Sequence, residues 1–180
     1  MVYLASTFSN LLANHVETGK YLSSLCAGSL PLFLLPAVFF IVSLLCTIAI
    51  GSAWGNFGIM IPIAIPMVTS LSGLPIPIDP QSLPLLLPVL GAIFSGSVCG
   101  NHVSPLADTM TMAATSCGIK PLTHAYTQFF YALPVIASTL FGYILMGTLV
   151  HLDPALNALL CLAASIILCL SILFFLGKKR

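Results

Sequence analysis

Charged residues are almost absent from this sequence. Of its 180 residues, five are Lys or Arg and four are Asp or Glu, which is 5% of the chain, against about a quarter in soluble proteins. Long stretches carry no charge at all, among them 21–78, 121–152 and 154–177. Such a chain cannot cover itself with a water-soluble surface, and runs of about 20 apolar residues are long enough to span a bilayer. The sequence therefore predicts an all-α integral membrane protein whose first partner is the lipid bilayer.

Other absences exclude whole classes of function. The sequence has no basic patch large enough to bind nucleic acid. Its six cysteines form no CxxC pair, and its Cys and His residues lack the spacing of a metal site. No GxSxG motif is present, and no second acid lies near Asp108 to form a carboxylate dyad. We therefore expect no enzyme, no resident cofactor and no structural metal.

Hydropathy predicts one membrane domain with about four to six transmembrane segments. Residues 1–21 are expected to form a short amphipathic helix or the end of a truncated one. The regions 22–72 and 84–117 are each predicted to contain a helix, a break and a half-helix, because polar, glycine-containing inserts interrupt their apolar runs. Residues 124–150 and 155–176 are predicted to be plain transmembrane helices.

The two breaks have the sequences GSAWGN at 51–56 and GNHVSP at 100–105. The half-helix after the second break, about 106–117, rises only about 18 Å, so it cannot cross a hydrocarbon core of about 30 Å. Unsatisfied backbone groups at membrane depth are costly, and discontinuous helices therefore usually line a substrate or ion site. We expect two such discontinuous (broken or re-entrant) helices here.

Orientation follows from the few basic residues. Lys178, Lys179 and Arg180 predict a cytoplasmic C-terminus. Two spanning helices then place the loop that contains Lys120 on the same side, and the turn at 151–153, which has no Lys or Arg, on the opposite side.

Asp108 is the candidate that matters most, because it is the only acid away from a predicted loop or terminus. An Asp at the centre of a membrane helix costs about 2.5–3.5 kcal/mol on insertion scales, so it should face a polar cavity. Ser104, Thr111 and Thr115 are spaced from it as neighbours on one helix face. A carboxylate among hydroxyls can hold either Na⁺ or H⁺. The alternative is that Asp108 caps the half-helix near Pro105 and lies among lipid headgroups.

Other residues in the breaks have two interpretations each. His102 can relay protons near neutral pH, or it can donate a hydrogen bond to a free carbonyl in the break. Trp54 is the only tryptophan and is either an interfacial anchor or a side chain that shapes a cavity. Asn101, with one acceptor and two donors, suits a bend or an ion. Gly96 and Gly100 predict close packing of two helices.

Two motifs resemble a known family. GSAWGNFGIMIPIAIP at 51–66 resembles the signature G-T/S-S-W-G-T-x-G-I-M-x-P-I-A-x-P of the NhaC-type Na⁺/H⁺ antiporter family. SGSVCGNHVSPLADTMTMAAT at 95–115 resembles that family's G-D-H/N-x-S-P-x-S-D-T-T segment, and residues 126–134 are similar to its Q-x-P-Y-A-L helix start. The order and spacing of these segments also match the family.

The resemblance implies a secondary transporter of the ion-transporter superfamily that performs sodium:proton antiport across the plasma (inner) membrane of a prokaryote. The transported ions would be Na⁺ and H⁺. The expected ion site contains Asn101, His102, Ser104, Asp108 and Thr109, to which the predicted helix face adds Thr111; the second break contributes Ser52, Trp54 and Asn56.

The sequence also departs from the family. Asn101 stands where relatives usually have an acid, Asn56 replaces a threonine, and Ala107 and Met110 replace hydroxyl residues. Fewer anionic ligands should weaken or re-tune cation binding. The chain resembles only the C-terminal half of a family member, so we expect either a partner chain that supplies the N-terminal half or a homo-oligomer.

Two other functions stay open from the sequence. One is an organic-acid (malate/lactate-type) Na⁺/H⁺-coupled exchanger of the same fold. The other is a truncated membrane subunit that does not transport.

Overall fold

The computed structural model describes residues 31–72 and 84–178, together with four isolated positions before them, Thr7, Leu11, Tyr21 and Ser24. These residues contain no strand. The amphipathic helix expected at 1–21 lies outside the described residues apart from three isolated positions.

The described helices follow one another along the chain with short connections. In order they are η2 (Leu32–Leu34), α3 (Leu35–Ile50), α4 (Ala53–Ser72), α5 (Leu86–Val103), α6 (Asp108–Ser116), α7 (Pro121–Thr148) and α8 (Pro154–Gly177).

Five helical stretches in the described part of the chain are long and apolar enough to cross a membrane: Leu32–Ile50, Ala53–Leu71, Leu86–Ser116, Pro121–Thr148 and Pro154–Gly177. The predicted class, an all-α membrane protein with about four to six spanning segments, is therefore confirmed. Within Leu86–Ser116 the helix is interrupted at residues 104–107. A helix that is discontinuous within the bilayer stays a prediction.

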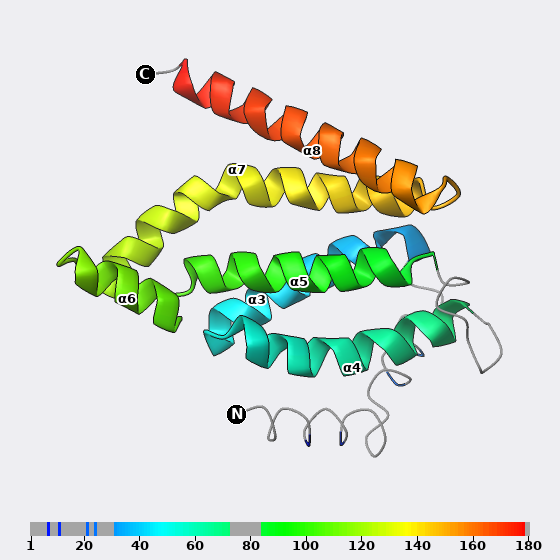
Figure 1. The fold of residues 1–180 in the computed structure, drawn as a ribbon, viewed down its shortest axis with the longest axis horizontal. Coiled ribbons are helices and arrows are strands. Elements are labelled where there is room, and N and C mark those ends of the chain that lie inside the picture. Colours follow the sequence, from blue (N-terminus) through cyan, green and yellow to red (C-terminus); the bar gives the residue numbers. More distant parts are fainter. Residues whose placement is uncertain are drawn as a thin grey trace.

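Prolines mark helix starts and bends. Pro36 lies in the first turn of α3, where its missing N–H costs nothing. The half-helix expected after the break at 51–56 is in fact the 20-residue α4, which continues through Pro62 and Pro66. Membrane helices tolerate internal prolines because neighbouring groups satisfy the freed carbonyls. α7 contains Pro134 and is visibly bent (Figure 1), as an internal proline causes.

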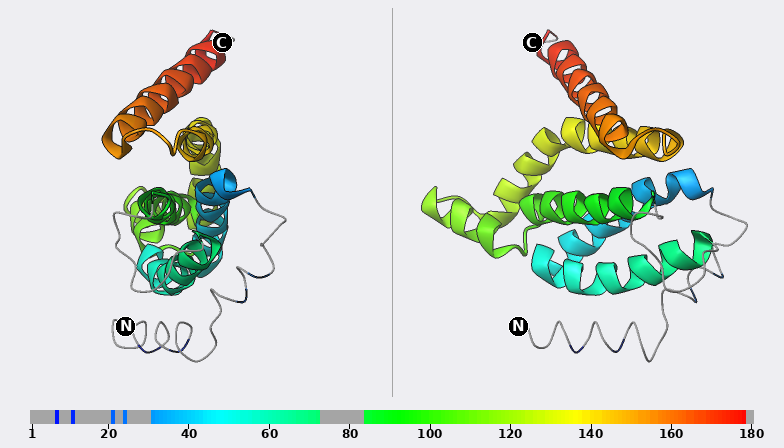
Figure 2. Two further views of the ribbon diagram at one scale, coloured as in Figure 1. Left: turned by 90° about the vertical axis from the view of Figure 1, so that its right-hand side faces the viewer. Right: turned by 45° about the vertical axis from the view of Figure 1, so that its right-hand side comes forward.

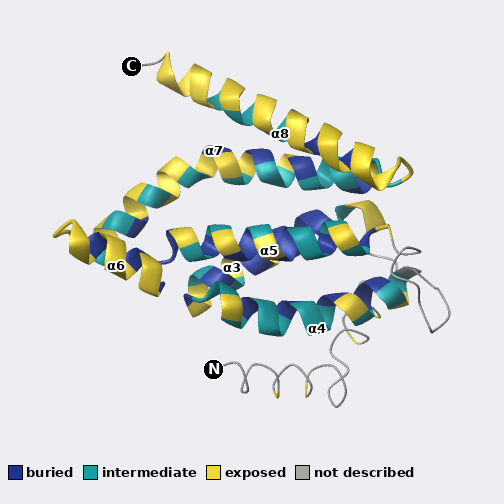
Figure 3. Ribbon diagram, viewed as in Figure 1, coloured by how far each residue is buried: buried dark blue, intermediate teal, exposed yellow. Residues whose placement is uncertain are grey.

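The core lies where α3, α4 and α5 pack together, and α7 lies against α3 and α5 (Figures 1 and 2). The buried residues of this core come from α3, α4, α5 and the residue before α5: Leu35, Phe39, Phe40, Leu44, Met60, Ala64, Met67, Val68, Leu85, Val89, Ala92 and Ile93. α8 packs chiefly on α7, on the far side from this core, and most of its residues are exposed (Figure 3).

Two glycines set the distance between α3 and α5. A Cβ atom built on Gly96 would lie 2.5 Å from the carbonyl oxygen of Phe40, and one on Gly100 would lie 2.6 Å from that of Leu44. Both distances are shorter than real Cβ contacts, so any larger residue would force the helix backbones apart. The predicted close packing at this glycine pair is confirmed.

We predict that Gly96→Ala lowers the stability of the chain by about 1–3 kcal/mol, the usual range for overpacking. The added methyl group would meet the Phe40 carbonyl, a backbone atom that cannot move alone. Thermal unfolding in detergent measures the effect. Gly91→Ala, on the same helix, is the matched control, because its Cβ would make only an ordinary 3.6 Å contact with the Tyr143 hydroxyl. Equal melting temperatures for the two variants would contradict the prediction.

Candidate functional site

The chain leaves the helical path between α5 and α6 at a proline. The residue before a proline is disfavoured in helical conformation, and Ser104, before Pro105, has the extended angles φ −77° and ψ 125°. Four residues later α6 begins at Asp108. The predicted break therefore falls at 104–107, a little after the expected start at Gly100.

Ser104 is a structural residue of this break. Its side chain is fully buried; its hydroxyl donates to the carbonyl of Ile48 at 2.8 Å and accepts from the N–H of Leu106 at 3.2 Å. The hydroxyl thus ties the loop to the last turn of α3. The expectation that Ser104 shares a polar helix face with Asp108 is wrong. Ser104 lies in no helix, because α5 ends at Val103 and α6 begins only at Asp108.

Asp108 is the first residue of α6, and its side chain is exposed. One carboxylate oxygen accepts from the N–H of Thr109 at 3.0 Å, a favourable place for a negative charge at a helix N-terminus. Asp108 thus lies at a helix N-terminus, as the alternative interpretation expected. This position also leaves the carboxylate accessible for a proton or an ion.

The hydroxyls that follow on α6 are bonded to their own helix. Thr111 donates to the carbonyl of Ala107, and Thr115 donates to that of Thr111. Both residues are exposed, as Asp108 is. Their oxygen lone pairs remain able to accept a hydrogen bond or to contact a cation.

A groove of about 720 Å³, lined mostly by apolar surface, lies beside this break. Its polar lining comes from α5, α6 and α7: Ser95, Asn101, His102, Thr109, Gln128, Tyr131 and Thr139. Asn101 donates from Nδ2 to the hydroxyl of Thr109 at 3.2 Å, which joins the end of α5 to the first turn of α6. The structure therefore brings three of the predicted site residues, Asn101, His102 and Thr109, to one surface.

Further residues of α5 and α7 line the groove. The side chain of His102 is exposed in the groove and makes no hydrogen bond to another described residue. Gln128 and Tyr131 line the groove from α7. Ser95 and Thr139 also line it, but sequence reasoning missed them because nothing in their apolar runs distinguishes these hydroxyls from those of Ser97 and Ser138 nearby.

The first break, between α3 and α4, contacts the second one. Gly51 ends α3 with φ +75°, in the left-handed region that glycine adopts without steric cost. A Cβ on Gly51 would lie 2.8 Å from the Cβ of Leu106 and 2.9 Å from its carbonyl. The interruptions near residues 51 and 106 are therefore packed backbone against backbone.

The three candidates of the first break do not form one site. The Ser52 hydroxyl accepts from the N–H of Gly55 at 3.2 Å, the usual role of a residue before a helix. Trp54 is 82% exposed and lies edge-on to Phe57. Asn56 is fully buried. Trp54 is not among the residues that line the groove beside the second break.

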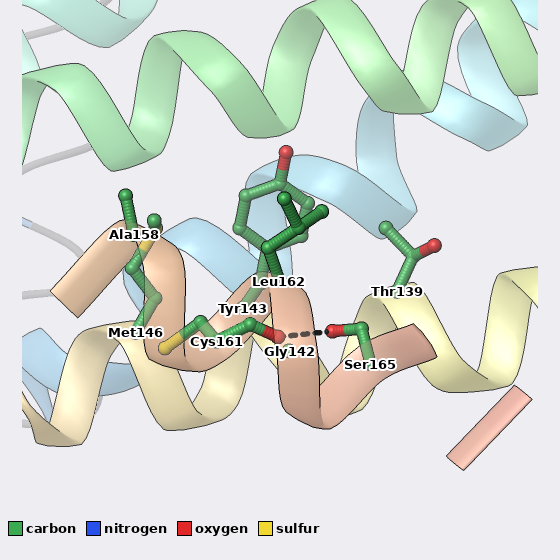
Figure 4. Close-up of a pocket in the computed structure, with 8 residues that line it drawn as sticks. All are labelled: Thr139, Gly142, Tyr143, Met146, Ala158, Cys161, Leu162 and Ser165. Carbon is green, nitrogen blue, oxygen red and sulfur yellow. Dashed lines mark hydrogen bonds between the residues drawn. The ribbon is translucent and has the colours of Figure 1, made fainter. Parts of the chain in front are cut away.

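A second hollow, of about 340 Å³, lies between α7 and α8 (Figure 4). Tyr143 on α7 lines it, and so does Ser165, whose hydroxyl donates to the carbonyl of Cys161 at 2.7 Å. The lining carries no carboxylate, amine or imidazole. This hollow therefore offers none of the groups expected of an ion site, and the groove beside Asp108 is the stronger candidate.

Comparison with known proteins bears on the class of molecule. Residues 1–148 match the model of the Na⁺/H⁺ antiporter family. A protein of Haemophilus influenzae named "Uncharacterized protein" is 38% identical over 138 residues, which is 77% of this chain and 25% of that protein. The malate-2H(+)/Na(+)-lactate antiporter of Bacillus subtilis is 33% identical over 130 residues, 67% of this chain and 25% of that protein. No solved structure matches the chain.

Both curated relatives are much longer than the stretch they share with this chain. The match covers about a quarter of each of them. Together with the five apolar helices, the family match identifies an integral membrane protein.

We predict that Ser104→Ala destabilises the chain by about 1–3 kcal/mol, because it leaves the Ile48 carbonyl and the Leu106 N–H without this partner. Chemical or thermal unfolding in detergent measures the loss. Ser171→Ala is the matched control, since that hydroxyl is exposed and donates only within its own helix. A loss no larger than that of Ser171→Ala would show that the loop does not depend on Ser104.

Proposed function

Because the chain belongs to the Na⁺/H⁺ antiporter family, we propose that it forms part of a secondary transporter that exchanges Na⁺ for H⁺ across the membrane. The observation that carries this proposal is the placement of Asp108. A lone accessible carboxylate begins α6 at a helix interruption, next to a groove lined by Asn101, His102 and Thr109.

The proposed exchange depends on one carboxylate with two possible occupants. A cation at Asp108 and a proton on Asp108 exclude each other, so loading from one side with Na⁺ and from the other with H⁺ couples the two fluxes. The exposed hydroxyls of Thr111 and Thr115 lie further along α6 and supply oxygen atoms of the kind that Na⁺ prefers. Free carbonyls at an interrupted helix add further ligands.

The groove supplies a route for the proton. His102 is exposed there, and its imidazole has one nitrogen that can donate a proton and one that can accept. Asn101 stands where the family resemblance leads us to expect a second acid. A neutral amide at that position leaves Asp108 as the only carboxylate near the groove among the described residues.

The surface around Asp108 fits a transporter of which this chain is one part. α6 and the adjoining first half of α7 are largely exposed (Figure 3), and they carry the polar residues Asp108, Thr111, Thr115 and Gln128 along with aromatic ones. Polar groups in a bilayer face a protein partner or water. We propose that a chain supplying the missing part, or a second copy, covers this face in the membrane.

An organic-acid exchanger is the second candidate. One relative is named as a malate-2H(+)/Na(+)-lactate antiporter. Substrate carboxylates would be expected at helix N-termini, near the starts of α4 and α6. The carboxylate of Asp108 already occupies the N-terminus of α6, and the Ser52 hydroxyl accepts from an N–H in the first turn of α4, so a substrate carboxylate would have to share or displace one of these side chains. Proton flux that requires malate or lactate, with no net response to Na⁺ alone, would favour this candidate.

We predict that Asp108→Asn abolishes Na⁺-dependent proton movement in proteoliposomes that contain the 180-residue chain, alone or with its partner chain. The amide keeps the shape of the side chain but cannot exchange a proton for a cation. A pH-sensitive dye inside the vesicles reports the flux when a Na⁺ gradient is applied.

Asp153→Asn is the matched control for this prediction. It removes the same charge from an exposed residue before α8, away from the groove, and should leave the flux unchanged. Persistent exchange in Asp108→Asn would refute the proposed mechanism. If correctly inserted wild-type protein gives no flux even with a partner chain, the chain is a non-transporting subunit.

A further inference from the structure

Three buried oxygen atoms lie without a hydrogen-bond partner in the contact between α3 and α4. They are Ser43 Oγ and Thr47 Oγ1 on α3 and Asn56 Oδ1 on α4. In the part of the chain that the structure describes, no other buried side-chain nitrogen or oxygen lacks a partner. All three residues are 0% exposed, so neither water nor lipid headgroups reach them from outside.

The three residues belong to one place in the core. Ser43 and Thr47 are one helical turn apart and therefore share a face of α3. That face packs on the glycine pair of α5: a Cβ on Gly96 would lie 3.2 Å from the Cβ of Ser43, and one on Gly100 would lie 2.8 Å from that of Thr47. Asn56 reaches the same place from α4, because its Nδ2 donates to the Ser43 carbonyl at 3.3 Å.

The hydrogen bonds of Asn56 fix which way its amide points. Nδ2 also donates to Ser97 Oγ at 2.6 Å, and that hydroxyl gives its own proton to the carbonyl of Ile93. Both partners of Nδ2 therefore act as acceptors, so exchanging the nitrogen and oxygen of the amide would lose both bonds. The carbonyl oxygen of Asn56 is the atom left free.

Ordinary helix packing does not explain the free hydroxyls. A serine or threonine in a buried helix usually donates to the carbonyl one turn before it, as Ser97 does to Ile93 and Ser138 does to Pro134. Ser43 and Thr47 do not. A buried polar atom without a partner costs about 1–3 kcal/mol, and a bound water or ion is one of the explanations for such a group in a native protein.

The chemistry of the three atoms favours a monovalent cation. All are neutral oxygens, and no group of three His, Cys, Asp or Glu lies together within the described residues to hold a multiply charged metal. Thr47 is in the last turn of α3, and Ser97 and Gly100 are in the last two turns of α5. The C-termini of α3 and α5, which are the negative ends of their helix dipoles, lie here beside the N-terminus of α4.

We propose that Ser43, Thr47 and Asn56 form a buried binding site for a single monovalent cation between α3 and α4, beside α5. None of the three lines the groove beside Asp108, so this is a second ion position. The choice of Na⁺ as the probe rests on the proposed function, but the site itself does not require transport.

The test is sodium-dependent stability of the purified 180-residue chain in detergent, with choline replacing Na⁺ at constant ionic strength. Wild-type protein should melt about 2–4 °C higher when Na⁺ is roughly five times its dissociation constant. Thr47→Val and Ser43→Ala should remove most of this rise. Without Na⁺, Thr47→Val should melt no lower than wild type, because it replaces an unpartnered hydroxyl by a methyl group.

Thr69→Val is the matched control, because that hydroxyl on α4 is already bonded to the carbonyl of Pro66; it should keep the sodium response. A wild-type melting temperature independent of Na⁺ would overturn the inference in favour of a buried water. A response that survives in both Thr47→Val and Ser43→Ala would also overturn it.

Asp108→Asn separates this inference from the proposed function. If the sodium response persists in Asp108→Asn and is lost in Thr47→Val, the buried site stands, whether or not the transport assay succeeds. If Asp108→Asn removes the response and Thr47→Val keeps it, the ion is held at Asp108 and the buried site is refuted, while the antiport mechanism gains support.

Discussion

The close approach of α3 and α5 is the constraint on which the rest of the structure depends. Gly96 and Gly100 let the backbone carbonyls of Phe40 and Leu44 lie where side chains would otherwise be. With α3 fixed this closely along α5, the end of α3 reaches the loop after α5. Gly51 then packs on Leu106, and Ser104 bonds to the last turn of α3. Two interruptions that are far apart in sequence thereby become one junction.

This junction divides the polar residues into two groups with different surroundings. The buried polar residues of α3, α4 and the middle of α5 point into the core, and Asn56 is the clearest example. Those at and beyond the interruption, above all Asp108, are exposed on α6 and along the groove. The same packing that buries uncharged oxygens in the core therefore keeps the carboxylate of Asp108 outside it, where a change of its charge would not disturb the helix contacts.

Much of this arrangement follows from the sequence, because its signals are local. The paucity of charge indicates the membrane helices, Pro36 and Pro105 indicate where helices begin and end, and the glycine pair indicates close packing. The position of Ser104 could not be predicted, because a four-residue step places side chains on one face only while the helix continues. The length of α4 was underestimated because Pro62 and Pro66 do not end it. The hydroxyls of Ser43 and Thr47 are buried without a hydrogen-bond partner because of contacts between three helices. Residue spacing in the sequence does not predict such contacts.

The few contacts of α8 beyond α7 have a consequence for the side chains that this helix requires. α8 packs chiefly on α7, through residues such as Asn157, which donates to the carbonyl of Met146 at 3.1 Å, and Cys161, the other buried residue of α8. Beyond these it diverges from the bundle (Figures 1 and 2), and the family match ends at the last residue of α7. Over most of α8, contacts within the described part of the chain therefore call for apolar side chains but for no particular side-chain shape.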